Sequence, residues 1–441
     1  MKRLITVAIM VTFILGTVGV AMAAHQPAEF KTGARGDWQI SVNAVKNPTF
    51  DDDADRNEFQ AVQRLRTAFE LAVNENVTGV FRLHTENRWG ESGHTVGASK
   101  GTAETTDAIG YDLAYVDFFI PQTNLNMRVG KQLHTLPAAL GSHILDNFAY
   151  SVLASAPITD MVGLTVAWAR GTDEDTDLSD QFDLFYAVVP VTLDGVQLNP
   201  FGAYGMFGKD FWGDTNVESN DVWYAGLNFS VDLLDPFVIM GDFNWGELSS
   251  NSTVDKGDAT RGWMAALAVE YNMDLLTPRL FGFYESGESS GSFDEDSTGK
   301  VMPNLGIGDV WGVSSFGFNG SQFRGDGRAR FNAIQGDAAW GATGKWGVGL
   351  HLRDITFIDQ VSHALQAVYY QGTNHRDHRD AGLFTTRDQA WEVNFNTNYQ
   401  MYENLAAILE LGYMGLDLSE DNESRNDDDA WKAAAGIRFR F

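Results

Sequence analysis

The sequence predicts an all-β fold: a transmembrane, antiparallel up-and-down β-barrel of about eighteen strands, with long external loops and short periplasmic turns. Three observations predict it. Apolar and polar residues alternate with a period of two through most of the chain after residue 36. The segments that connect the alternating stretches are short and long in turn. The chain also begins with an export signal, which directs the rest of it out of the cytoplasm.

The export signal occupies residues 1–23. It has a charged start at Lys2, a largely apolar stretch over residues 4–20 and a small-x-small end at Ala21-Met22-Ala23, which is typical of a cleavage site. Its removal leaves residues 24–441 as a single barrel domain. No later stretch is apolar over the roughly 18 residues that a spanning helix needs, so the exported chain is either soluble or a barrel.

Composition excludes several classes of protein. The chain has 441 residues, no cysteine and a formal net charge of -28. Without thiols it has no disulfide framework and no cysteine metal site. The negative charge argues against nucleic-acid binding, because phosphate recognition needs a basic surface. Asp51, Asp53 and Asp55 begin a calcium-loop pattern, but Arg56 stands where glycine is required. We therefore expect no metal site and no cofactor.

Eighteen segments carry the strand pattern. In residues 59–73, for example, Phe59, Leu65 and Phe69 share one face while Arg64 and its even-numbered neighbours share the other. Sixteen strands is the alternative, if one weak hairpin is a loop, and 147–156 is the weakest segment. The predicted strands are 37–45, 59–73, 78–89, 110–120, 125–133, 147–156, 161–170, 182–191, 196–207, 221–232, 237–248, 262–272, 279–287, 343–354, 363–372, 389–399, 405–416 and 430–441.

The connections alternate between two kinds. Eight are short turns, and nine are long polar loops that hold more than half of the acidic residues. This rhythm is typical of membrane barrels, whose turns face the periplasm and whose loops face outward. An even number of strands places both termini on the periplasmic side. The longest loop covers residues 288–342.

Aromatic residues recur at the spacing of the two membrane interfaces. Trp263 and Tyr271 are eight residues apart, as are Trp391 and Tyr399. The even spacing keeps each pair on one face of its strand. Eight tilted residues cover roughly 20 Å along the membrane normal, which nearly spans the apolar band of such a barrel. These pairs predict aromatic girdles on the outer surface.

The last strand alternates strongly and ends on Phe441. Its apolar residues share one face, while Lys432, Arg438 and Arg440 share the other. An alternating last strand with a terminal phenylalanine resembles the assembly signal of bacterial outer-membrane barrels. With the export signal and the loop rhythm, the exported chain resembles trimeric porins. The segments 128–132 and 367–372 are similar to those of homotrimeric porins of sulfate-reducing bacteria.

This resemblance implies a function. We expect an outer-membrane porin, a homotrimer whose water-filled channel passes small hydrophilic solutes and ions by diffusion. It would be inserted by the barrel assembly machinery and surrounded by outer-membrane lipid and lipopolysaccharide. Two alternatives stay open. A substrate-specific channel can also have eighteen strands, and the long loops suit a receptor, adhesin or surface-structural barrel. No Ser–His pair suits a lipid-facing hydrolase, so we expect no enzyme.

Strand parity predicts the charged residues of the pore constriction. Charge facing lipid near mid-membrane costs about 2–4 kcal/mol per arginine, so arginines alternating with apolar residues should face the lumen. The alternative is that these arginines are scattered polar residues of the lumen with no role in a filter. Inward carboxylates such as Glu70 and Glu86 would also neutralise part of the positive charge of the wall. The predicted lumen-facing basic wall consists of Arg64, Arg66, Arg82, Arg88 and Arg128.

One loop should face this wall from inside the barrel. The resemblance to general porins implies that the third external loop, residues 134–146, folds inward, with Asp146 as a possible acidic partner. That loop is short and lacks a dense acidic run. The longer loop 288–342, which carries Arg324, Arg328 and Arg330, is the alternative occupant of the mouth.

Overall fold

The computed structural model describes most of the chain. Within the described part, no helix is long and apolar enough to cross a membrane. The predicted signal segment 1–23 lies outside the described residues. These residues are 31–47, 57–89, 109–140, 144–172, 181–208, 220–249, 259–290, 298–303, 305, 323, 344–381, 383–419 and 429–441.

The described residues form one antiparallel sheet and a short 3₁₀ segment, η2 (Arg376–Ala381). The strands are β1 (Lys31–Lys46), β2 (Asn57–Asn74), β3 (Val77–Arg88), β4 (Gly110–Phe119), β5 (Asn126–Thr135), β6 (Asp146–Pro157), β7 (Gly163–Thr172), β8 (Phe182–Val188), β9 (Val191–Leu193), β10 (Val196–Phe207), β11 (Asn220–Leu234), β12 (Phe237–Ser249), β13 (Thr260–Tyr271), β14 (Thr277–Glu285), β15 (Lys345–Ile358), β16 (Val361–Gly372), β17 (Gln389–Tyr402), β18 (Leu405–Asp417) and β19 (Ala430–Arg440).

Strands β8 and β9 are two parts of one barrel strand. Both pair with β10, and only Val189 and Pro190 separate them. Proline has no N–H to donate to the ladder, so the pairing is interrupted there. The barrel therefore has eighteen strands, as predicted, and not sixteen.

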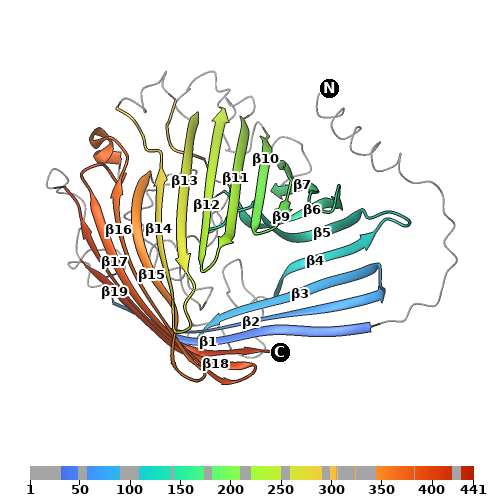
Figure 1. Ribbon diagram of the computed structural model, residues 1–441, viewed down its shortest axis with the longest axis horizontal. Coiled ribbons are helices and arrows are strands. Elements are labelled where there is room, and N and C mark those ends of the chain that lie inside the picture. The colour runs from blue at the N-terminus through green and yellow to red at the C-terminus, as the bar shows by residue number, and fades with distance from the viewer. Residues whose placement is uncertain are drawn as a thin grey trace, which may run out of the picture.

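The sheet closes on itself. Each strand pairs with its neighbours in sequence, and β19 pairs with β1 to complete the ring (Figure 1). At the short-turn end of this seam, the Gly36 N–H donates to the Phe441 carbonyl at 2.7 Å, and the Phe441 N–H donates back at 3.1 Å. A Cβ on Gly36 would lie 2.3 Å from the Phe441 ring, so only glycine fits beside the terminal residue.

The two faces of the wall follow the predicted alternation. Trp263, Tyr271, Trp391 and Tyr399 are all exposed on the outer surface, whereas alternate residues such as Met264 are buried inside. An apolar outer surface with aromatic residues near both ends is what a lipid environment requires.

Candidate pore constriction

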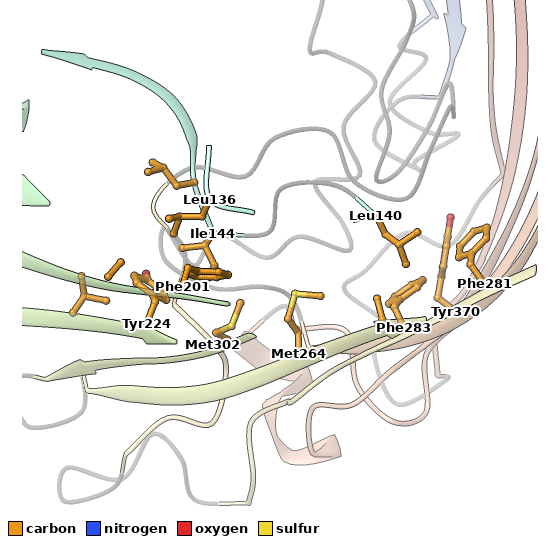
Figure 2. Close-up of a cluster of buried hydrophobic side chains, with 14 of the residues drawn as sticks. Leu136, Leu140, Ile144, Phe201, Tyr224, Met264, Phe281, Phe283, Met302 and Tyr370 are labelled. Carbon is orange, nitrogen blue, oxygen red and sulfur yellow. The ribbon is translucent and has the colours of Figure 1, made fainter. Parts of the chain in front are cut away.

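The third external loop folds into the barrel. Leu136, Leu140 and Ile144 are almost fully buried and pack inside the ring rather than outside it. Figure 2 shows these side chains beside residues of the far wall. The wall residues shown there are Phe201, Tyr224, Met264, Phe281, Phe283 and Tyr370, from strands β10, β11, β13, β14 and β16. Of the two loops proposed from the sequence, 134–146 thus enters the lumen.

A single carboxylate holds the tip of this loop. The backbone N–H groups of Ala139 and Leu140 donate to the two carboxylate oxygens of Asp242, at 2.6 and 2.9 Å. Asp242 projects inward from β12 and is 3% exposed. Hydrogen bonds to an ionised acceptor are stronger than neutral ones, so this contact fixes the depth of the loop. This role of Asp242 was not predicted from the sequence. The one sign of it in the sequence is an acidic residue at an inward position of its strand, between Gly241 and Phe243.

Part of loop 288–342 also lies inside the barrel. The Lys300 N–H donates to Glu288 at 2.8 Å, and Met302, two residues further on, is buried against the same apolar cluster. The Leu305 N–H donates to the Ile144 carbonyl at 2.8 Å, which joins the two loops. Further along, Phe323 packs with Ile408 and Ala434 of the inner wall. Arg324, Arg328 and Arg330 lie outside the described residues.

Three predicted arginines meet at two aspartates. Arg82 forms a two-point contact with Asp112, at 2.6 and 2.8 Å, and the Arg66 Nε lies 3.4 Å from the same carboxylate. Arg64 donates to Gln39 at 3.1 Å and lies 3.6 Å from Asp37.

Asp37 carries a further arginine from the last strand. The Arg438 Nε donates to Asp37 at 2.5 Å across the seam between β19 and β1. This arginine was placed on the polar face by the sequence but was not included in the predicted wall. The basic wall therefore extends across the seam.

Arg128 belongs to a separate pair. It donates to Asp117 at 2.8 Å, and its guanidinium lies 4.7 Å from the centre of the Tyr115 ring. Salt bridges with three aspartates, Asp37, Asp112 and Asp117, thus involve all four predicted arginines whose side chains are described.

Asp146, Glu70 and Glu86 make other contacts in the described part of the chain, and the Arg88 side chain lies outside it. The Arg88 backbone lies in β3, but its side chain is outside the described residues. Asp146 begins β6 and accepts a long 3.5 Å hydrogen bond from Thr135, with no described wall arginine within ion-pair distance. Glu70 pairs with Arg35 near the barrel end at 2.7 Å, and Glu86 lies 3.7 Å from His84.

The sequence pattern missed Asp112 for a specific reason. The register between β3 and β4 shifts at this point, because Arg82 pairs with Leu113 and Leu83 with Tyr111. The extra residue Asp112 sits in a β-bulge, where period-two reasoning cannot assign a face. Asp117 lies beyond the bulge, directly opposite Arg128. To predict this pair, one must know the register between β4 and β5 as well as the period-two pattern of each strand.

A second polar group lines the lumen near the short turns of β13–β15. Glu270 accepts from Arg279 at 2.5 Å and lies 3.1 Å from Arg353, with His351 in register beside Arg279. The sequence predicted these strands but did not assign their charged residues to the lumen, although the exposed apolar neighbours Tyr271 and Leu280 mark Glu270 and Arg279 as inward by parity.

Exposure differs between the two sides of the lumen. The side chains of Arg66, Arg82 and Arg128 are 22%, 24% and 39% exposed. On the far side, Met264 and Tyr370 are each 1% exposed. With β8 and β9 as one strand, β2 and β12 stand nine places apart in the ring of eighteen. The loop is thus tied to the wall opposite the arginines, where Arg66, Arg82 and Arg128 stay partly exposed while Arg64 is buried.

Fold and lumen together define the class: this is a closed, eighteen-stranded antiparallel up-and-down β-barrel with a loop folded into its lumen. Among solved structures, the chain is similar to OccAB4 of Acinetobacter baumannii, with 11% identity, a TM-score of 0.57, and coverage of 94% of this chain and 100% of that one. It is also similar to OpdO of Pseudomonas aeruginosa, with 12% identity, a TM-score of 0.57, and coverage of 93% of this chain and 97% of that one. For OprD of the same organism, the identity is 14% and the TM-score 0.55, with coverage of 96% of this chain and 99% of that one. No protein-family model and no curated protein matches the chain. At these identities the likeness concerns the fold.

Proposed function

We propose that the protein is an outer-membrane porin, whose water-filled channel passes small hydrophilic solutes and ions by diffusion. One observation carries the proposal: an inward-folded loop is fixed to one wall, and a partly exposed charged wall stands opposite it. Channels select by bore width and by the charges at the narrowest point. The likeness to Occ and OprD porin barrels supports the same class of function.

Planar-bilayer recording tests this proposal. Purified protein should give stepwise conductance increments of uniform size. A preparation that is folded, as judged by heat-modifiable migration and β-rich circular dichroism, but that gives no increments would contradict it.

A substrate-specific channel is the second candidate. It is favoured by the filling of the lumen from two loops, since Met302 and Phe323 join the third loop inside the barrel. Liposome-swelling rates separate the two candidates. A general porin should pass neutral sugars in simple order of size, whereas a specific channel should pass one charged class faster than neutral solutes of equal size.

The loop-dominated receptor or adhesin is less well supported. Val301 and Met302 are buried inside the barrel, so this part of loop 288–342 does not form an external binding surface. No catalytic role is proposed for any residue.

Cellular location and assembly are part of the proposal. We infer cleavage after Ala23, insertion by the barrel assembly machinery through the signal at Phe441, and a homotrimer resembling porins of sulfate-reducing bacteria. N-terminal sequencing of the exported protein tests the cleavage. Light scattering of the detergent-solubilised protein tests the trimer, and a monomer mass would contradict it.

A further inference from the structure

A row of polar and charged residues crosses the lipid-facing surface of β5–β8. Lys131 pairs in register with Tyr150, Tyr150 with Arg170, and Arg170 with Asp183. Directly paired residues share a face of the sheet. That face is the outer one, because Val129 and Leu133, two residues to either side of Lys131, are 40% and 44% exposed.

Two tyrosines surround the ammonium group of Lys131. Its Nζ lies 4.8 Å from the ring centre of Tyr111 and 5.9 Å from that of Tyr150, and it donates to the Tyr111 carbonyl at 3.1 Å. The two phenol oxygens are 2.6 Å apart. Both rings are exposed, so the cation and the paired hydroxyl groups are presented together on the surface.

The charges of this row do not cancel. Arg170 forms a two-point contact with Asp183, at 3.0 and 2.9 Å, and Trp168 donates to the same carboxylate. No described carboxylate lies within ion-pair distance of Lys131. Among the described residues, the row therefore keeps one uncompensated positive charge on a surface that otherwise faces lipid.

The site lies toward the loop end of the barrel. Tyr111 is the second residue of β4 from that end, Tyr150 the fifth of β6, and Lys131 is four residues below the end of β5. At roughly 2.5 Å of height per tilted residue, this is within about 12 Å of the strand ends. A basic side chain costs about 2–4 kcal/mol at mid-membrane but only about 0–1 kcal/mol near the interface.

The donors at this site match a phosphate group. The ammonium has three N–H groups and uses one on the Tyr111 carbonyl, which leaves two. In the hydrogen-bonded pair of Tyr111 and Tyr150, one hydroxyl donates its proton to the other oxygen, and the proton of the second hydroxyl is free. This free O–H is the third donor at the site. Below the site, toward the periplasm, Val116 and Val129 are exposed and offer an apolar surface to acyl chains.

We propose that Lys131, Tyr111 and Tyr150 bind a phosphate group of lipid A in the outer leaflet. The apolar surface directly below the donors favours a lipid over free phosphate, and the level of the site favours a lipid of the loop-side leaflet. The inference rests on the proposed outer-membrane location.

Native mass spectrometry of protein folded in lipopolysaccharide-free detergent tests the proposal. Diphosphoryl lipid A is titrated against the protein, with dephosphorylated lipid A, phosphatidylglycerol and inorganic phosphate as separate arms. Lys131→Gln should weaken lipid A binding about tenfold, as expected for loss of a charge-assisted contact. The Tyr111→Phe/Tyr150→Phe double variant should weaken it less, and only diphosphoryl lipid A should show this dependence.

Lys46→Gln is the matched control. Lys46 is an exposed outward lysine at the loop end of β1, paired in register with Trp431 and without a tyrosine pair. This variant should bind lipid A as the unmodified protein does. Equal binding of diphosphoryl lipid A by Lys131→Gln and by the unmodified protein would overturn the proposal. Binding of dephosphorylated lipid A to the unmodified protein as tight as that of diphosphoryl lipid A would overturn it as well. A change in oligomer mass with unchanged lipid adducts would assign the row to contact with a second copy and overturn it too.

Conductance of the same preparations separates this proposal from the proposed function. Lys131 lies outside the lumen, so Lys131→Gln should conduct normally. Lys131-dependent lipid A binding by a protein that does not conduct would contradict only the channel. Normal conductance with Lys131-independent binding would contradict only the lipid site.

Discussion

The walls formed by β1–β5 and by β10–β16 belong to one sheet and follow the same alternation, yet their inner faces differ in chemistry. The first presents Arg66, Arg82 and Arg128 in partly exposed pairs with aspartates. The second presents Phe201, Met264 and other apolar groups, buried under the third loop (Figure 2). Its charged group of Glu270, Arg279 and Arg353 lies near the short turns, away from these apolar groups.

The difference shows how a barrel can have both a core and a channel. An apolar inner wall gains free energy when a loop covers it, at about 25 cal/mol per Å² of apolar area removed from water. A wall of ion pairs gains little from being covered, because buried charges lose their hydration. The loop therefore settles on β10–β16 and leaves Arg66, Arg82 and Arg128 of the charged wall partly exposed.

Detaching the third loop from the wall formed by β10–β16 should have the largest effect on the channel. In the Asp242→Ala variant, the amides of Ala139 and Leu140 lose their acceptor, at about 1–3 kcal/mol for each buried group left unsatisfied. We expect lower stability in urea unfolding and a larger, noisier single-channel conductance. Glu247→Ala, on the same strand and without a described contact to the loop, is the control. A channel of unchanged size in Asp242→Ala would show that this carboxylate does not position the loop.

Loss of packing under the loop should come next. Leu140 is almost fully buried against the far wall, so Leu140→Ala should lower the free energy of unfolding by about 2–5 kcal/mol. The control is Leu133→Ala, which removes the same atoms from the lipid-facing side. Equal losses in the two variants would mean that the loop adds no core to the lumen.

The charged wall should control ion preference more than stability. The triple variant Arg64→Ala/Arg66→Ala/Arg82→Ala leaves Asp37 and Asp112 without these partners, so the sign of the wall reverses. Reversal potentials in a salt gradient should shift toward cation preference by a few-fold in permeability ratio, because lumen charges are less screened than those in open water. Arg35→Ala, an exposed pair near the barrel end, should change little. An unchanged reversal potential in a folded triple variant would remove these residues from the filter.

Neutralising the single carboxylate of Asp112 should have the smallest effect, and it should shift ion preference in the direction opposite to that of the triple variant. Asp112→Asn keeps the shape of the bulge but removes one negative charge between Arg66 and Arg82. We expect a slight shift toward anion preference, measured in the same salt gradient. A shift toward cations would mean that these arginines do not face the ion path.

The sequence by itself determined the sheet and its faces. Period-two alternation is local, and a lipid exterior makes one parity apolar, so Trp263 and Arg64 were assigned to opposite faces without any knowledge of neighbouring strands. Connection length predicted the order of turns and loops and favoured eighteen strands over sixteen. All these signals can be read without knowing which strands are neighbours.

Only the tertiary structure decided how the lumen is divided. The Asp242 carboxylate meets Ala139 across about one hundred residues of sequence, and no local pattern identifies such a partner. Asp112 acquires its role from a bulge that depends on the register between two strands. The carboxylates that balance the arginines, and the wall on which the loop settles, follow from which side chains a closed ring brings face to face. Ring closure is a long-range property, so the charge of the channel is decided by pairing across the barrel rather than by the sequence of any one strand.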